Sequence, residues 1–252
     1  MRTIAVTGSA SGLGAAIRGM LEDLDDRVIG VDLHDAEVVA DLSAPEGRAA
    51  AIAGVQSAAG GALDGLVVGA GLGPHVEDRA RIASVNYFGA VELLDGLRGA
   101  LAAGSDAAAV AVSSNSATGD PSIDPELVDV FLSGDEGEAR RRAPAAGGMV
   151  YGASKRALAR AVRRRATGWA EVGVRLNAVA PGPFASPMMD ALLDSPVRPM
   201  IEAYPIPMGR RGEVVEVVGA VVFLLSAMAS WIHGSVLFVD GGTDALLRPD
   251  AI

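Results

Sequence analysis

The sequence contains no cysteine and only three histidines, His34, His75 and His233. Without cysteine, the chain can form neither a disulfide bond nor a thiolate metal site. The histidines are far apart in the sequence, which argues against a zinc site with imidazole ligands. We therefore expect a protein that holds no metal.

An excess of basic charge and a long apolar run are also missing. Lys and Arg number 21 against 31 Asp and Glu, so the net charge is −10. An acidic balance argues against nucleic acid as a partner. No apolar run reaches membrane-spanning length without glycine or charge. The chain also begins on a strand-like segment, residues 1–7, rather than on a charged leader with a cleavage site. We expect a cytoplasmic protein that binds neither nucleic acid nor membrane.

Strand-like and helix-like segments alternate over 252 residues, half of them hydrophobic, which fits a single domain spanning 1–252. Nearly continuous apolar strands that alternate with helices predict an α/β fold with a doubly wound parallel sheet of about seven strands, covered by helices on both faces. The predicted strands are 3–7, 27–32, 37–42, 65–71, 107–113, 174–180 and 235–239, and the predicted helices are 15–24, 47–59, one within 79–101, 151–172 and 213–227.

A glycine-rich segment, Gly8-Ser-Ala-Ser-Gly12-Leu-Gly14, joins the first strand to the first helix, and Asp32 ends the second strand. Such glycines let the backbone approach a pyrophosphate at a helix N-terminus. A carboxylate about 20 residues further on accepts from ribose hydroxyls and repels a 2′-phosphate, which favours NAD over NADP. A tight structural turn, with Asp32 as a strand-end turn residue or helix cap, is the alternative interpretation.

Tyr151 and Lys155 stand one turn apart on the same face of a predicted helix. A nearby cation lowers the pKa of a phenol, which lets the tyrosine exchange a proton with a substrate oxygen near neutral pH. The sequence has twenty arginines and Lys155 is its only lysine. Because Arg and Lys are not interchangeable at a site, this choice of residue argues against a random surface charge. A surface pair on an exposed helix is the alternative.

In their order along the chain, these features resemble the short-chain dehydrogenase/reductase family, whose members have a Rossmann-type fold. The resemblance covers almost the whole chain and includes Asp41-Leu42, Asn86, Ser114, Pro181-Gly182 and Asp240-Gly-Gly242. A more particular resemblance is to the bacterial 3α-hydroxysteroid dehydrogenase/carbonyl reductase branch. It rests on Asp35-Ala-Glu37, Ala40-Asp-Leu-Ser43, Gly71-Leu-Gly-Pro74, Ser84-Val-Asn-Tyr-Phe-Gly89, Pro207-Met-Gly-Arg-Arg211 and Arg248-Pro249.

The resemblance implies catalytic roles for four residues. Tyr151 would be the general acid and base, and Lys155 would lower its pKa and bind the nicotinamide ribose. Ser114 would hold the substrate oxygen against Tyr151, where a donor can stabilise developing negative charge. Asn86 would hold a water near Lys155. Adjacent side chains on a strand point opposite ways, which separates Ser114 from Ser113. The alternatives are a turn cap for Ser114 and a backbone contact for Asn86.

The resemblance also implies a cofactor site. Its predicted residues are Gly8, Ser11, Gly12, Leu13, Gly14, Asp32, Leu33, Asp41, Leu42, Ala70, Gly71, Tyr151, Lys155, Pro181, Gly182, Phe184 and Ser186. Three positions depart from the family pattern. Gly69 replaces an Asn that ties the central sheet together, so we expect weaker strands there. Phe184 and Ser186 stand where the family has Ile or Val and Thr, and Ser186 can still donate to the carboxamide.

Two segments are irregular. The insert, about 115–150, separates Ser114 from Tyr151 by far more than the family's usual spacing, and 125–132 within it looks like a short helix. It either rims the substrate cleft, alters a subunit contact or is a solvated surface excursion. The second segment, about 184–211, is the substrate lid in the family. Its Met-rich apolar sequence fits a bulky hydrophobic ligand, or alternatively ordinary helix packing.

Together these residues predict an NAD-dependent oxidoreductase that moves a hydride between nicotinamide and a secondary alcohol or ketone. The resemblance favours a hydroxysteroid or similar hydrophobic substrate and a homodimer or homotetramer. The alternatives are a dehydrogenase for a terpenoid or xenobiotic alcohol, and a non-catalytic NAD-binding sensor.

Overall fold

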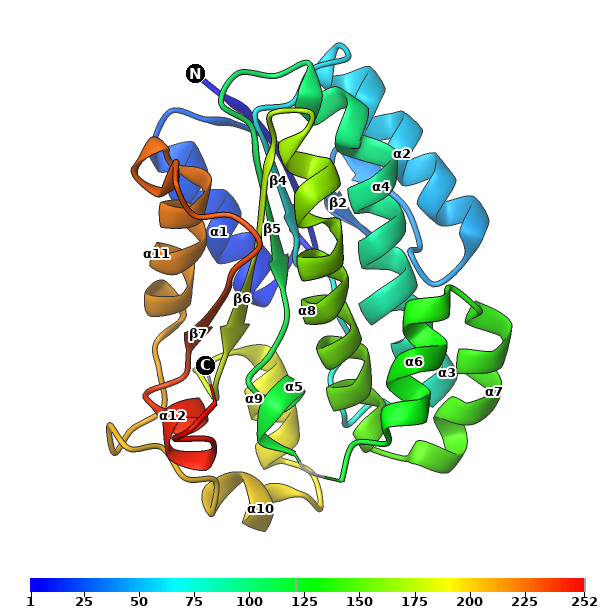
Figure 1. Ribbon diagram of the computed structural model, residues 1–252, viewed down its shortest axis with the longest axis vertical. Helices are drawn as coiled ribbons and strands as arrows, with labels where there is room; N and C mark the ends of the chain where they lie inside the picture. The colour runs from blue at the N-terminus through cyan, green and yellow to red at the C-terminus, as the bar shows by residue number, and fades with distance from the viewer. Residues whose placement is uncertain (121, 252) are drawn as a thin grey trace.

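The computed structural model describes residues 1–120 and 122–251. Its centre is a seven-stranded parallel sheet in the order β3-β2-β1-β4-β5-β6-β7, visible edge-on in Figure 1. The predicted α/β class, a Rossmann-type sheet covered on both faces, is confirmed. The strands are β1 (Thr3–Thr7), β2 (Arg27–Asp32), β3 (Val38–Val39), β4 (Gly65–Val68), β5 (Ala108–Val112), β6 (Arg175–Pro181) and β7 (Val236–Val239).

Helices cover both faces of the sheet, as Figure 1 shows. One face packs against α1 and α11, and the other packs against α2, α4 and α8. The helical segments are α1 (Gly12–Asp23), α2 (Pro45–Ala59), α3 (Arg79–Ala83), η1 (Ser84–Gly89), α4 (Ala90–Ala102), α5 (Ser116–Gly119), α6 (Pro125–Ser133), α7 (Glu136–Ala146), α8 (Met149–Ala170), α9 (Pro187–Leu193), α10 (Arg198–Glu202), α11 (Val214–Leu225), η2 (Ala227–Ala229) and α12 (Thr243–Leu247).

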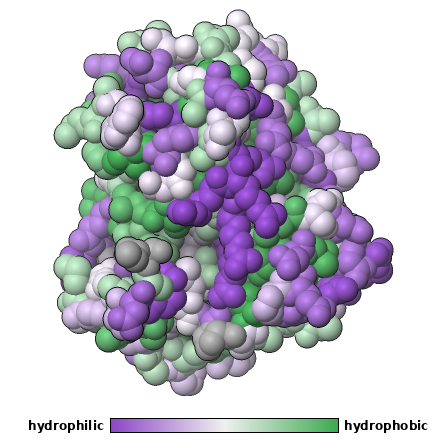
Figure 2. Space-filling model, in the orientation of Figure 1, coloured by the Kyte–Doolittle hydropathy of each residue, from purple (hydrophilic) through white to green (hydrophobic). Residues whose placement is uncertain are grey.

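Helix α8 shows why the sequence folds in this way. Its inner face is apolar and buried, with Ala157, Ala161 and Val162 at helical spacing, whereas Arg160 and Arg163 are exposed. Figure 2 shows the resulting hydrophilic band over α8. Among the described residues, no helix is both long and apolar enough to cross a membrane.

The helix predicted within 79–101 is interrupted. Segments α3 and α4 flank η1, a π-helical stretch that carries Asn86. Apolar spacing in the sequence did not indicate this change of winding, because every residue of η1 is buried and the segment has no polar face from which a period could be read. The strand predicted at 37–42 is shorter, since only Val38 and Val39 pair with β2.

The insert forms helices α5, α6 and α7. Helix α6 matches the predicted 125–132 segment, but α7 was not predicted, because its sequence is highly charged and contains Pro144. Phe131 of α6 is fully buried and packs against the rings of Tyr87 and Phe88 in η1, at centroid distances of 5.2 and 5.9 Å. A solvated surface excursion is therefore wrong as an interpretation: the insert is part of the hydrophobic core.

The segment after β6 carries α9 and α10, and its two ends are held together. Phe184 and Gly212 form an isolated β-bridge, with Ala185 N donating to Gly212 O at 2.9 Å and Gly212 N donating to Pro183 O at 3.0 Å. We call residues 184–212 the excursion. Because it is closed at its base, it projects as one unit beyond the carboxyl ends of the strands (Figure 1).

Although residue 69 is a glycine, hydrogen bonds still connect the ends of strands β1 and β4. The Thr7 hydroxyl accepts hydrogen bonds from the backbone N–H groups of both Gly69 and Ala70 at 3.0 Å. A Cβ on residue 69 would lie 3.0 Å from the Thr7 carbonyl oxygen, which is tighter than ordinary contact. Thr7 thus joins the ends of β1 and β4, and this structure offers a substitute for the Asn that the family has there.

A buried arginine fastens the insert to the rest of the domain. The Arg48 side chain is 1% exposed and binds Glu92 of α4 at 2.7 Å and Glu136 of α7 at 2.6 Å. It also donates to the Leu42 carbonyl at 3.3 Å. Removing one partner of a buried pair leaves charge without compensation, which is costly.

We predict that Arg48→Ala lowers the free energy of unfolding by about 2–3 kcal/mol, less than a fully enclosed pair would lose because Glu92 remains partly exposed. Urea unfolding monitored by circular dichroism measures this change. The matched control is Arg142→Ala, which removes an arginine from exposed pairs on α7 and should leave the unfolding midpoint nearly unchanged. Equal effects of the two substitutions would contradict the special role of Arg48.

Candidate active site

The predicted site residues gather at the carboxyl ends of the strands. The strand order reverses between β1 and β4, and in doubly wound sheets ligands bind in the crevice at this switch point. The glycine segment follows β1, Ala70 and Gly71 follow β4, and Ser114 follows β5. The fold therefore brings together segments that are more than a hundred residues apart in the sequence.

The glycine segment forms a tight turn into α1. Gly8 has a φ of +74°, and a Cβ on Gly14 would lie 2.0 Å from the Gly8 carbonyl oxygen. By contrast, a Cβ on Gly12 would meet only Pro187 Cδ, at 3.7 Å. The N-cap residue Ser11 makes no side-chain capping bond. The free N–H groups of this helix start, together with the open space at Gly12, fit a pyrophosphate.

Asp32 lies beside this turn. Its carboxylate accepts from Ala10 N at 2.9 Å and from Leu33 N at 2.7 Å. These bonds make Asp32 a turn residue, as the alternative interpretation proposed, and they also hold a negative charge next to the glycine segment. A group in that place is suited to ribose hydroxyls, so the two interpretations are compatible.

The next predicted cofactor positions follow β3 and β4. Asp41 accepts from Ser43 N at 2.9 Å and pairs with Arg81 at 3.5 Å, and these contacts, the Ser43 bond foremost, lower the pKa of Asp41. Leu42 is buried. At the end of β4, a Cβ on Gly71 would lie 3.3 Å from Lys155 Nζ, so the backbone there passes directly beside the lysine.

Tyr151 and Lys155 lie in the first turns of α8. Lys155 is 4% exposed, so the pair is not a surface pair. The ammonium donates to the Val112 carbonyl at 2.8 Å and lies 5.9 Å from the centre of the Tyr151 ring. Ser113 Oγ donates to the Lys155 carbonyl at 2.9 Å, which fastens α8 to the end of β5.

Burial sets the protonation of both groups. It lowers the pKa of Lys155 to about 8, because the site desolvates the ammonium. It raises the pKa of Tyr151, and the Ser114 side chain partly opposes that rise. The direction for Tyr151 differs from the sequence-based prediction of a lowered pKa, because in this structure the effect of desolvation exceeds any attraction from Lys155.

The two serines at the end of β5 have different partners, as strand alternation predicts. Ser113 contacts α8, whereas the Ser114 hydroxyl lies near Tyr151 and accepts from Ser116 N at 3.2 Å and Ser116 Oγ at 2.9 Å. Ser114 thus has the cap-like contact of the alternative interpretation. Its own proton stays available for a substrate oxygen beside the phenol.

The Asn86 amide is occupied by the backbone. Its Oδ1 accepts from Leu72 N at 2.7 Å and its Nδ2 donates to Leu72 O at 2.9 Å. A Cβ on Gly71 would lie 3.4 Å from Asn86 Oδ1 and 3.3 Å from Lys155 Nζ. The structure therefore gives the amide the backbone contact of the alternative interpretation, and that contact holds the turn next to Lys155.

The remaining predicted positions border the site from β6. A Cβ on Gly182 would lie 2.7 Å from Asp240 Cα, so only glycine fits there. The Ser186 hydroxyl caps α9 by accepting from Met189 N at 3.2 Å. That bond leaves the Ser186 proton close to Phe184 O, at 3.4 Å, and Phe184 itself forms the bridge at the base of the excursion.

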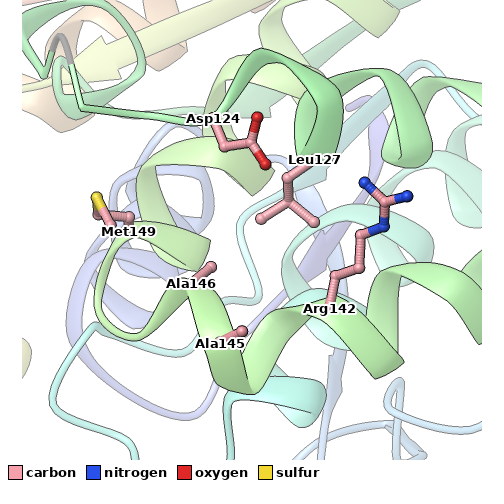
Figure 3. A pocket seen from close by; sticks show the side chains of 6 residues that line it. All are labelled: Asp124, Leu127, Arg142, Ala145, Ala146 and Met149. Atoms are coloured by element: carbon pink, nitrogen blue, oxygen red, sulfur yellow. The ribbon is translucent and has the colours of Figure 1, made fainter.

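Two residues that support the site were not identified from the sequence. Thr7 holds the Gly69–Ala70 turn, and Ser116 donates to Ser114. Hydroxyl side chains near the ends of strands and helices are common, so the sequence alone did not indicate that Thr7 and Ser116 support the site. A hollow of about 290 Å³ also lies in the insert, between α6, α7 and the start of α8 (Figure 3). Its lining includes Met149 but none of the predicted site residues.

Comparison with known proteins identifies the architecture. A family model described as enoyl-(acyl carrier protein) reductase matches residues 137–244. The chain is 43% identical to the 3-alpha-hydroxysteroid dehydrogenase/carbonyl reductase of Comamonas testosteroni, over 99% of each chain. It is 44% identical to the 3-alpha-hydroxysteroid dehydrogenase of Pseudomonas sp. B-0831, solved with NADH, at a TM-score of 0.96 over 99% of this chain and 100% of that one.

A third similar structure, from Beutenbergia cavernae, is described as a candidate NAD(P)-dependent gluconate 5-dehydrogenase with NADP bound at low occupancy. It is 29% identical at a TM-score of 0.75, over 97% of each chain. Similarity of this extent, together with the glycine turn and the Tyr151–Lys155 pair, leads to one conclusion. The chain belongs to the short-chain dehydrogenase/reductase family and is an oxidoreductase that acts on alcohol and carbonyl groups.

Proposed function

We propose that this protein is an NAD-dependent dehydrogenase that interconverts a hydrophobic secondary alcohol, such as a hydroxysteroid, and the corresponding ketone. The observation that carries the proposal is the buried Lys155 ammonium, placed beside Tyr151 and Ser114 at the same strand ends as the glycine turn. A nicotinamide dinucleotide bound at that turn supplies the hydride acceptor or donor.

In carbonyl reduction, Tyr151 gives its proton to the substrate oxygen, and in alcohol oxidation its phenolate form accepts that proton. Because burial raises the pKa of Tyr151, the protonated form that reduction needs is favoured. Ser114 donates to the same oxygen and holds it against the phenol. Lys155 keeps two ammonium protons beyond the one given to Val112 O. These protons are suited to ribose hydroxyls, whereas the positive charge does not overcome the effect of burial on the pKa of Tyr151.

The preference for NAD over NADP rests on Asp32. Its carboxylate is fixed at the glycine turn through Ala10 N, and a 2′-phosphate on the neighbouring ribose would meet this negative charge. The NADH complex of the Pseudomonas relative supports this choice, whereas the NADP complex of the Beutenbergia relative shows that the family fold accepts either cofactor.

The hydrophobic substrate rests on the excursion and on the names of the similar enzymes. Helix α9 buries Met189 and Leu192. Met188 Cγ lies 2.9 Å from the position of a Cβ on Gly73, in the loop after β4. Methionine side chains adapt to irregular apolar shapes, and both hydroxysteroid dehydrogenases cited above share more than two fifths of their residues with this chain.

We predict that Tyr151→Phe lowers kcat for a 3α-hydroxysteroid by about 10²–10⁴-fold, because the proton has no acceptor, while NADH binding is retained. NADH formation and NADH fluorescence titration measure the two effects. Wild-type turnover of other secondary alcohols without the steroid would refute the steroid assignment alone. A mutant within about threefold of wild type, far below the effect of a general base, would refute the role of Tyr151.

We predict that Asp32→Asn lowers the preference for NAD over NADP by at least about tenfold in kcat/KM, since loss of one charge weakens rejection of the 2′-phosphate by more than about 1.4 kcal/mol. Asparagine keeps one oxygen, which can accept from Ala10 N, and loses the bond from Leu33 N, so the contact with the glycine turn is retained. Asp35→Asn, at an exposed position nearby, is the control. Equal cofactor ratios in both variants would remove Asp32 from the ribose site.

We predict a pH-dependent stability difference between wild type and Lys155→Met. The unfolded lysine keeps its proton to about 10.5, whereas the folded one releases it near pH 8. Between these values the unfolded chain binds more protons, so wild-type stability rises with pH relative to the variant, by roughly 3 kcal/mol over the whole window. Denaturant unfolding at pH 7 and pH 10 tests this, and a constant difference would contradict it.

A further inference from the structure

The last part of the excursion, residues 204–208, is fastened to the turn between β7 and α12. Thr243 Oγ1 donates to the Pro205 carbonyl at 2.8 Å, and Met208 N donates to the Gly241 carbonyl at 3.1 Å. A Cβ on Gly242 would lie 3.4 Å from Pro207. This end of the excursion is therefore held by backbone geometry as well as by hydrogen bonds.

The first part of the excursion reaches the cofactor side of the site. Pro187 Cδ is the nearest atom to the open face of Gly12, and Met188 lies against Gly73. The excursion thus spans the strand ends, from the glycine turn to α12. A dinucleotide held at the glycine turn would therefore lie next to the start of α9.

Tyr204 lies where the excursion meets the catalytic side. A Cβ on Gly119 of α5 would be 3.3 Å from the Tyr204 hydroxyl, so the phenol packs on the short helix that follows Ser114. Burial raises the pKa of Tyr204, and Asp240 contributes to that rise, whereas the Asn115 side chain opposes it. The phenol is thus neutral at physiological pH and close to the Asn115 amide.

Asn115 has an unmet donor. It directly follows Ser114, is 5% exposed, and its backbone N–H donates to the Pro181 carbonyl at 2.9 Å. Its Nδ2 has no hydrogen-bond partner among residues 1–120 and 122–251. The same atom faces Gly182, where a Cβ would lie 3.2 Å from it. Buried donors without a partner are rare, because each costs the free energy of desolvation.

Building on the proposed NAD-dependent function, we propose that Tyr204 is a positioning residue, a latch between α10, which has no buried residue, and the fastened Pro205. Its phenol oxygen accepts from Asn115 Nδ2 when α9 and α10 close over the bound dinucleotide. This bond joins the excursion to the segment that carries Ser114. Closure then fixes Ser114 against the substrate and slows the release of the dinucleotide in the same movement.

Stopped-flow NADH release from the enzyme–NADH complex, without any alcohol, tests the latch. Tyr204→Phe removes one hydroxyl and should speed release about fivefold or more, the effect expected for one ordinary hydrogen bond. Tyr87→Phe, which removes the same atom from the buried aromatic cluster at η1, is the matched control and should release NADH at the wild-type rate. Asn115→Ala should equal Tyr204→Phe, and the double variant should be no faster than either.

Release within about twofold of wild type in Tyr204→Phe, less than the loss of a single hydrogen bond gives, would overturn the latch. Equal acceleration in Tyr87→Phe would also overturn it, since that indicates general loosening. If Asn115→Ala fails to fold, the comparison of the two tyrosine variants still decides. The assay needs no turnover, so it separates the two proposals. Wild-type protein that fails to bind NADH would refute the proposed function. Tyr204→Phe protein that binds NADH normally and releases it at the wild-type rate would refute only the latch.

Discussion

The buried ammonium of Lys155 is the constraint on which the rest of the site depends. Removing a cation from water is costly unless partners compensate it, and here the protein supplies one carbonyl, that of Val112. The contacts around it keep this geometry in place. Ser113 fixes the backbone of α8 to β5, and Asn86 holds the Gly71–Leu72 turn on the other side of the ammonium. Tyr151 and Ser114 are then positioned by the same helix and strand end.

Two additions enlarge the common architecture around this centre. The insert is joined to the core by an aromatic cluster at Phe131 and by the Arg48 ion pairs, so it behaves as a structural layer over η1. The excursion is instead tied mainly at its base and at its far end, through Gly212 and Thr243. The first addition is anchored through the core, whereas the second is anchored through its ends and through the buried side of α9. Helix α10, none of whose residues is buried, is therefore the part of the excursion that is freest to move.

Local patterns in the sequence were enough to predict the sheet, the glycine turn and α8. The strands and α8 have regular apolar spacing, and the turn has glycines where the backbone must bend tightly. The π-helical stretch around Asn86 was not predictable, since all of its residues are buried and no alternation of polar and apolar residues marks its winding. Helix α7 was missed because Pro144 and its charges conceal the pattern. Arg48 and Glu136 are 88 positions apart, and contacts of that kind depend on the completed fold, as does the desolvation that raises the pKa of Tyr151.

The rarity of lysine has a consequence for chemical modification. Apart from the amino terminus, Lys155 is the only primary amine in the chain, and it is 4% exposed. Acylating reagents need the free amine and need access to it, so in the folded protein they react at the exposed amino terminus and only slowly at Lys155. Because only 4% of Lys155 is exposed, a reagent reaches its amine faster when the contact between α8 and β5 opens. The rate of acylation at Lys155 therefore responds to local opening at the reaction centre.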